Sequence, residues 1–141
     1  MKIPKPSVGI WDIIYLYNVV YDGVPIRERP FLVVDKNTDC FSSVSLLEIS
    51  GQPKTGGKFP YNEPVTRSSQ NGLNQDSHVK CDMLYINCEH IITGVNVIKF
   101  GELEQDKYSA KINLSIRKAR DNQTLVYIDQ SNNGIVLRGW E

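Results

Sequence analysis

A pair of cations stands directly before an apolar run in the first third of the chain. Arg27 and Arg29 precede Pro30, and Phe31 to Val34 then form a run of the aromatic and β-branched kind typical of a buried strand. Pro30 has no amide N–H and a fixed φ, so it suits the first residue of a strand. Arg29 is therefore expected at a rigid strand end, from which a guanidinium can contact a phosphate. The plainer alternative is a solvated arginine at a strand edge.

A second group mixes cations with aromatic rings in the polar stretch after residue 51. Its members are Lys54, Lys58, Phe59 and Tyr61, with Arg67 beyond them. Cations can follow a phosphate backbone and rings can stack on bases, so this composition suits the binding of a single nucleic-acid strand. The alternative is an ordinary solvated loop, because two prolines, two glycines and two lysines over residues 52–60 leave no periodic pattern.

Lys80 and Asp82 form a third candidate group. They lie two residues apart on a predicted strand, so their side chains are expected on the same face of it. The alternative is a surface salt pair, which is worth well under about 1 kcal/mol.

The histidines and cysteines do not form a metal-binding pattern. The candidates are His78, Cys81, Cys88 and His90. There is no C-x-x-C pair, and Cys88-Glu89-His90 is too tightly spaced for a structural zinc site. No local signature marks a thiol nucleophile either. We therefore predict no metal and no cofactor, and expect the cysteines to be buried and free.

The elements that position these candidates are mostly strands. The sequence predicts strands over residues 11–20, 30–35, 44–50 and 78–87, a short strand at Val65, and a hairpin over residues 124–138. Brief strand pairing is expected at residues 91–92 or 95–100, on either side of Thr93-Gly94. Asn133-Gly134 is a strong hairpin-turn signal. Gly72 interrupts a polar stretch, and a close approach between segments is expected there.

One helix is predicted over residues 104–120. Its apolar stripe consists of Tyr108, Ile112, Ile116 and Ala119. These residues recur at the spacing of one helix face. Acidic residues gather at the start and basic residues at the end, which complements the helix dipole. We expect this helix to pack on the strands as a structural element.

This order of elements predicts a mostly β fold with one principal helix, such as a small barrel, followed by a terminal hairpin. A chain of 141 residues is expected to form a single domain, 1–141, with residues 121–141 as a C-terminal hairpin extension. Sixteen basic residues balance sixteen acidic ones, which argues against a general polyanion binder. Three cysteines without a signal-like N-terminus or a long apolar run predict a cytoplasmic protein with no membrane span.

Several stretches, taken in order, resemble the MazF/PemK family of toxin endoribonucleases from toxin–antitoxin modules. They are Trp11 to Ile14, Arg29 to Val34, Ile49 to Gly51, Val79 to Asp82 and Gly101 to Leu103, the last leading into the helix. The likeness runs over roughly residues 8–120. The sequence departs from the family at Trp11, where glycine is usual, and at Lys80, where some members have arginine.

The resemblance implies an SH3-like barrel that works as a homodimer and is held in check by an antitoxin protein. It implies cleavage of single-stranded RNA without a metal, by attack of a ribose 2′-OH that leaves a 2′,3′-cyclic phosphate. Arg29 would stabilise the charge that develops on phosphorus, and Ser50 would bind a phosphate oxygen or orient the attacking group. By the same resemblance, Lys80 and Asp82 would lie near the same cleft and contact RNA or tune Arg29. Arg27 and the mixed group at residues 54–67 are further candidate RNA contacts.

A different class of function stays open. The same barrel could be a protein-binding module without catalysis, such as a CcdB-like poison of a protein target or a phage-type interaction module. The neutral charge, and the lack of the histidine that some members carry after the first strand, favour this alternative. The ordered set of Arg29, Ser50 and Lys80 favours the ribonuclease.

Overall fold

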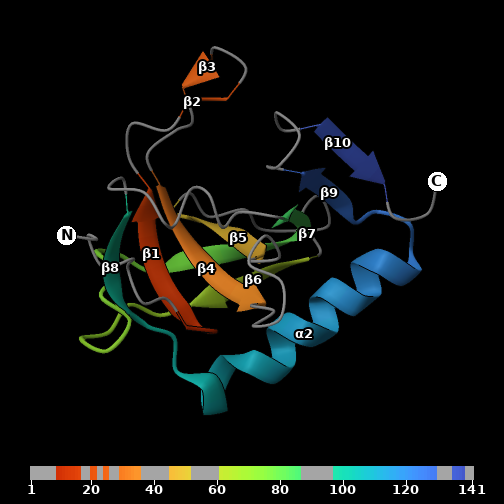
Figure 1. Ribbon diagram of the computed structural model, residues 1–141. Coiled ribbons are helices and arrows are strands. Elements are labelled where there is room, and N and C mark those ends of the chain that lie inside the picture. The colour runs from red at the N-terminus through yellow and green to blue at the C-terminus, as the bar shows by residue number, and fades with distance from the viewer. Residues whose placement is uncertain are drawn as a thin grey trace.

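A computed structural model of the chain describes residues 9–16, 20–21, 24–25, 29–35, 45–51, 61–86, 97–129 and 135–138 (Figure 1). Its strands are β1 (Asp12–Leu16), β2 (Val20–Tyr21), β3 (Val24–Pro25), β4 (Arg29–Asp35), β5 (Ser45–Ser50), β6 (Asn62–Val65), β7 (Ser77–Ile86), β8 (Val97–Glu102), β9 (Val126–Asp129) and β10 (Ile135–Arg138). The helix is α2 (Gln105–Asp121).

Most of these strands belong to one sheet. Its order is β10-β9-β7-β5-β4-β1-β8, and β6 adds a further pairing along β7. Neighbours are antiparallel except β7 and β9, whose parallel pairing is made possible by the long connection through β8 and α2. Among the described strands, β2 and β3 pair with each other and project beyond the end of the larger sheet (Figure 1).

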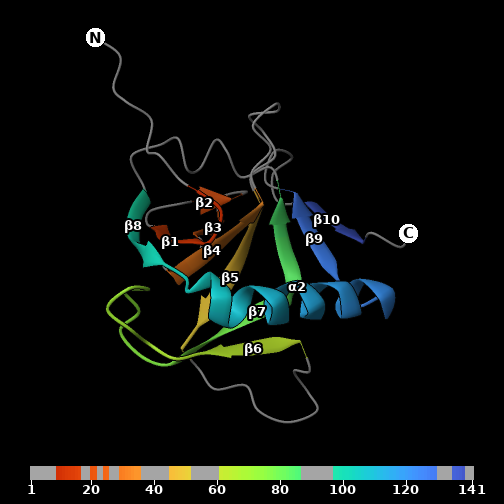
Figure 2. The same cartoon turned by 90° about the horizontal axis from the view of Figure 1, so that it is seen from below.

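Alternation along the strands gives the sheet two faces. The face that we call the helix face packs against α2, which contacts β6 and β7 and lies across it (Figure 2). Its buried side chains, together with those of α2, are Ile13, Leu32, Leu47, Ile49, Val65, Val79, Cys81, Tyr108 and Ile112. The opposite face, which we call the outer face, alternates with these positions. It also has a buried apolar part, made of Ile14, Phe31, Val33 and Leu46.

The predicted helix and its apolar stripe are confirmed. Tyr108, Ile112 and Ala119 are buried, and Ile116 packs partly buried against the core. An acidic residue lies in the first turn and basic residues lie in the last, so both ends complement the dipole as expected.

The mostly β class and the terminal hairpin are also confirmed, but the described strands do not close into the predicted small barrel. β10 and β8 form the two edges of an open sheet. The segment after β6 crosses to β8 instead, where the Glu102 N–H donates a 3.0 Å hydrogen bond to the Gln70 carbonyl. β6 is only four residues long, so the chain leaves strand geometry before it reaches β8.

The close approach predicted at Gly72 is confirmed. Gly72 has a φ of +71°, and a Cβ there would lie 2.3 Å from the Phe100 carbonyl oxygen. A Cβ on Gly101 would similarly lie 2.3 Å from the Gln70 carbonyl oxygen. Two glycines therefore allow the 66–76 segment to lie directly on β8.

Two predicted loops fall outside the described residues: the stretch 52–60 and the hairpin turn at Asn133-Gly134. In the part that the structure does describe, no helix is long and apolar enough to span a membrane.

Candidate functional site

The strand registers bring the two predicted catalytic positions together at one end of the outer face. Phe31 of β4 pairs with Glu48 of β5, and continuing this antiparallel register by two residues places Arg29 across from Ser50. Arg29 begins β4 and pairs on its other side with Leu16 of β1. The placement of the Arg29 side chain lies outside what the structure describes.

Ser50 is the last residue of β5 and is only 2% exposed. Its partner on β7 is His78, which in turn pairs with Pro64 of β6. One row across the sheet therefore runs from Arg29 through Ser50 to His78. Side chains of paired residues point to the same face, so the Ser50 hydroxyl and the His78 imidazole share one end of the outer face, next to the backbone position of Arg29.

Lys80 is paired, though not with Asp82. Its ammonium lies 3.5 Å from a carboxylate oxygen of Glu48, and the two side chains are 26% and 13% exposed. Glu48 stands two residues before Ser50 and Lys80 two residues after His78, so alternation puts this ion pair on the outer face beside the row. Asp82 is partly buried farther along β7.

Sequence reasoning missed Glu48, although the alternation along β5 already placed it on the face of Ser50. The sequence also did not predict that Lys80 pairs with a residue of the neighbouring strand. The β5–β7 register shifts between Leu47 and Ile49, so neither strand's sequence by itself identifies the cross-strand partner of Lys80.

His78 and Asn62 are the other polar side chains of this region. Asn62 begins β6 and pairs with Lys80, so it faces the same way as His78. The Nδ1 atom of His78 and the Nδ2 atom of Asn62 are buried without a hydrogen-bond partner in the described structure. The sequence marked His78 as a candidate metal ligand or partner of a thiol nucleophile, and no pattern in the sequence marked Asn62.

Tyr61 and Arg67, two members of the mixed cation and aromatic group, are held elsewhere. Tyr61 packs against the core of the helix face, and its hydroxyl accepts a 2.9 Å hydrogen bond from Asn122 just after α2. Arg67 is exposed on the 66–76 segment, where its guanidinium donates to the Asn74 carbonyl at 3.2 Å.

The remaining predicted RNA contacts, Arg27, Lys54 and Lys58, lie outside the described residues. So do Phe59, Cys88 and His90. Within the described ranges, no three side chains from histidine, cysteine, aspartate and glutamate are grouped so that they could hold a metal ion.

Cys81 is buried and free, as predicted for the cysteines. Burial raises the pKa of its thiol far above the usual range, and the nearby carboxylates of Glu63 and Asp82 raise it further. This thiol therefore stays protonated at neutral pH and is unsuited to nucleophilic attack.

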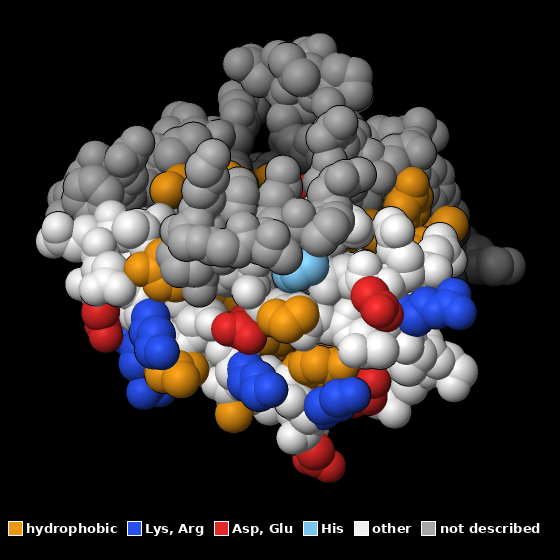
Figure 3. All heavy atoms as spheres, turned by 180° about the vertical axis from the view of Figure 1, so that it is seen from behind, with side chains coloured by type: hydrophobic (Ala, Val, Ile, Leu, Met, Phe, Trp, Pro, Cys, Tyr) orange, Lys and Arg blue, Asp and Glu red, His pale blue; other side chains and the backbone are white. Residues whose placement is uncertain are grey.

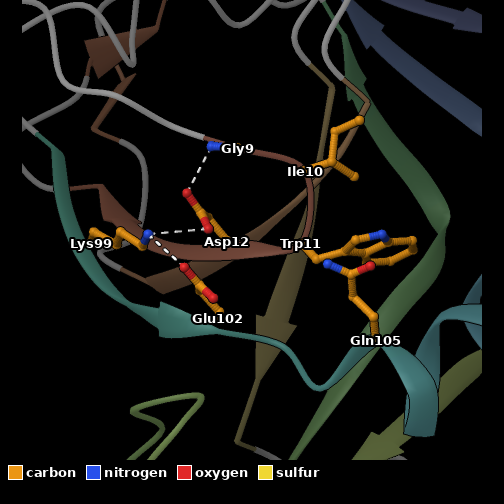
Figure 4. A pocket seen from close by; sticks show the side chains of 7 residues that line it. All are labelled: Gly9, Ile10, Trp11, Asp12, Lys99, Glu102 and Gln105. Carbon is orange, nitrogen blue, oxygen red and sulfur yellow. Dashed lines mark hydrogen bonds and ion pairs between the residues drawn. The ribbon is translucent and has the colours of Figure 1, made fainter.

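A second polar cluster lies at the start of β1, where Asp12 is the acid that carries the family resemblance (Figure 4). The Asp12 carboxylate accepts a 2.7 Å hydrogen bond from the Gly9 N–H and lies 3.3 Å from the Lys99 ammonium. Lys99 also lies 3.1 Å from Glu102. The cluster lines a depression of about 330 Å³. Because these contacts tie the chain before β1 to β8, the role of Asp12 here is structural.

Charges are mixed on the face of the molecule shown in Figure 3. Lysine and arginine side chains alternate there with aspartate and glutamate and do not gather into one basic patch (Figure 3). This agrees with the formal net charge of zero. A polyanion would therefore need a local site rather than a broad basic surface.

No protein-family model matches the chain, and a search of curated proteins finds no similar sequence. Its fold is similar to a solved structure, an endoribonuclease from Mycobacterial species, with a TM-score of 0.54 and 16% sequence identity. The match covers 80% of this chain and 91% of the other. At this identity the likeness establishes a shared fold.

Proposed function

We propose that this chain is an endoribonuclease that cuts single-stranded RNA in the manner of MazF/PemK toxins. One observation carries the proposal: on a fold shared with a solved endoribonuclease, the β4–β5 register brings the start of β4 at Arg29 across from Ser50. These are the two positions at which the sequence resembles the catalytic residues of that family.

The reaction is a transfer within the RNA. The 2′-oxygen of a ribose attacks the adjacent phosphorus, the bond from phosphorus to the 5′-oxygen breaks, and a 2′,3′-cyclic phosphate and a 5′-hydroxyl result. The attacking hydroxyl loses a proton and the leaving oxygen gains one. Negative charge grows on the phosphate oxygens in between, and groups that stabilise such charge usually make the largest contribution to catalysis.

Arg29 is assigned to that charge, because a guanidinium offers planar donors that match two phosphate oxygens at once. Ser50 is assigned to a hydrogen bond with a phosphate oxygen or with the attacking group. Its burial at a strand end supports a fixed hydroxyl position. Lys80, which forms an ion pair with Glu48, would add positive charge beside the bound RNA strand.

The homodimer and the antitoxin partner belong to the same proposal and follow from the family resemblance alone. A non-catalytic protein-binding module is the second candidate. The mixed charges on the face shown in Figure 3 favour it, since they offer little attraction to RNA at long range.

The test is a cleavage assay on a long, weakly structured RNA in excess EDTA. It compares the parent protein with Arg29→Ala and with Arg117→Ala, a control that removes an exposed arginine from α2. We expect discrete fragments ending in cyclic phosphate from the parent and the control. Loss of one charge-stabilising group should slow Arg29→Ala by about 100- to 1000-fold. Intact RNA with folded parent protein would instead support the protein-binding module.

A further inference from the structure

Asn62 and His78 are unusual among the buried polar groups of the described chain. Each has a nitrogen atom that is shielded from solvent and makes no hydrogen bond in the described structure. They belong to neighbouring strands, β6 and β7, at register positions two residues apart. Because buried polar groups are nearly always paired, two orphan atoms on one face of adjacent strands call for a common explanation.

A bound ligand would satisfy both atoms. An unpaired buried donor or acceptor costs free energy, and a ligand that hydrogen-bonds to it recovers that cost. His78 lies directly across from Ser50, one of the proposed catalytic residues. A ligand that occupies the Ser50 position therefore lies one strand spacing from His78 and two strand spacings from β6, which carries Asn62.

The chemistry of the two side chains suits a nucleobase better than a phosphate. A carboxamide can offer a donor and an acceptor together, and a neutral imidazole also has one of each. Base edges present the same mixture, whereas a phosphate presents only acceptors. The cation of the region is Lys80, which lies across from Asn62 and is held by Glu48, so phosphate contact falls to a separate side chain.

We propose that Asn62 and His78 form a base-reading subsite that hydrogen-bonds one nucleobase beside the cleaved phosphate and so selects the sequence that is cut. This inference rests on the proposed ribonuclease function and adds its specificity. The subsite contributes no charge to the reaction, so removing it alters which RNA is cut more than how fast a suitable RNA is cut.

The first experiment measures cleavage preference. The parent protein, Asn62→Leu, His78→Leu and the control Asn113→Leu are given a pool of RNAs randomised around the cut, and the fragment ends are sequenced. Asn113 is an exposed amide on α2, so its replacement matches the chemistry of Asn62→Leu away from the site. We expect Asn62→Leu and His78→Leu to reduce discrimination at one position by roughly tenfold, and Asn113→Leu to keep the parent preference.

Thermal unfolding of the same proteins separates a ligand site from a structural role. An apolar side chain of similar size removes the cost of an unpaired group, so Asn62→Leu should keep or raise the Tm. A marked fall in Tm would mean that Asn62 supports the fold, and would overturn the proposal.

A binding measurement completes the test. The imidazole nitrogens of His78, identified by their loss in His78→Leu, should shift when an RNA made uncleavable by a 2′-deoxy residue is added. Parent protein that neither cuts nor binds RNA overturns the proposed function and the subsite together. Parent protein that cuts RNA while both variants keep its sequence preference, or slow every sequence equally, overturns the subsite alone.

Discussion

Asn71 and Asn62 are both asparagines with buried amide nitrogens, yet their surroundings differ completely. Asn71 is fully buried near the start of α2, where its side-chain Oδ1 atom accepts hydrogen bonds from the backbone N–H groups of Ser68 and Leu73. Its amide group donates to the Thr66 carbonyl and to the Glu104 carboxylate. On the outer face, the amide nitrogen of Asn62 has no such partner in the described structure.

Asn71 and Asn62 represent two kinds of buried polar side chain: one whose side chain hydrogen-bonds within the chain, and one with an unpaired nitrogen atom in the described structure. Around Asn71, every bond stays inside the chain and fixes the 66–76 segment against the helix start. On the outer face, the Asn62 Nδ2 and His78 Nδ1 atoms are buried without a hydrogen-bond partner in the described structure. We infer that residues of the helix face contribute mainly to the free energy of unfolding, and that residues of the outer face contribute mainly to RNA binding and cleavage. Substitutions on the two faces should therefore differ in whether stability or RNA handling changes first.

The largest effect is expected at the centre of the helix face. Ile112→Ala removes a fully buried side chain from the core and should lower the free energy of unfolding by about 2–5 kcal/mol, measured by urea denaturation. Cleavage by the fraction that remains folded should equal that of the parent. A variant that stays folded but loses cleavage activity would contradict the inference that the two faces contribute separately to stability and to RNA cleavage.

A smaller loss of stability is expected at Asn71. Asn71→Ala leaves the Ser68 and Leu73 amides and the Thr66 carbonyl without this partner, which should cost about 1–3 kcal/mol of unfolding free energy. Chemical denaturation beside Asn62→Leu checks the comparison directly. Equal destabilisation by both changes would contradict it.

On the outer face, Lys80→Met should affect RNA more than stability. The partly exposed ion pair with Glu48 is worth about 1 kcal/mol or less, so the Tm should change little. If Lys80 contacts a phosphate, the dependence of log affinity on log salt should become shallower by about 0.7 for a single strand. Titration of uncleavable RNA at several salt concentrations measures this slope. An unchanged slope would show that Lys80 does not contact an RNA phosphate.

The smallest effect concerns the cluster at Asp12. The neighbouring carboxylates of Glu102 and Asp12 raise the pKa of Lys99 above its ordinary value of 10.5. Because the pKa is higher in the folded state, this contribution is fully present below pH 10.5 and is lost as pH rises through the folded pKa. The Tm of the parent should fall slightly more than that of Lys99→Met between pH 9.5 and 11.5, values chosen about one unit either side. Parallel curves would contradict the assignment.

Local patterns in the sequence predicted the elements well. The stripe from Tyr108 to Ala119 predicted α2, and Pro30 with its apolar run predicted the start of β4, because both signals depend on neighbours along the chain. The sequence of segment 66–76 has no periodic pattern of apolar residues from which its conformation could be predicted. Its conformation depends on the hydrogen bonds of Asn71 and on the fit of Gly72 against Phe100, which are contacts between distant residues.

The site was predictable only in part for the same reason. The patterns of individual β-strands indicated Arg29 and Ser50. The ion pair of Lys80 with Glu48 joins residues that are 32 positions apart, across a register shift between two strands. The orphan atoms of Asn62 and His78 have no signature in the sequence at all, since burial without a partner is a property of the packed structure.

The proposed ribonuclease function requires that RNA binds the outer face of the sheet. The most direct test is a titration of isotope-labelled protein with uncleavable single-stranded RNA, followed by backbone amide shifts. We predict the largest changes at Glu48, Ser50, His78 and Lys80, with residues 105–121 of α2 unchanged. Shifts confined to α2, or no shifts at all at saturating RNA, would contradict the claim.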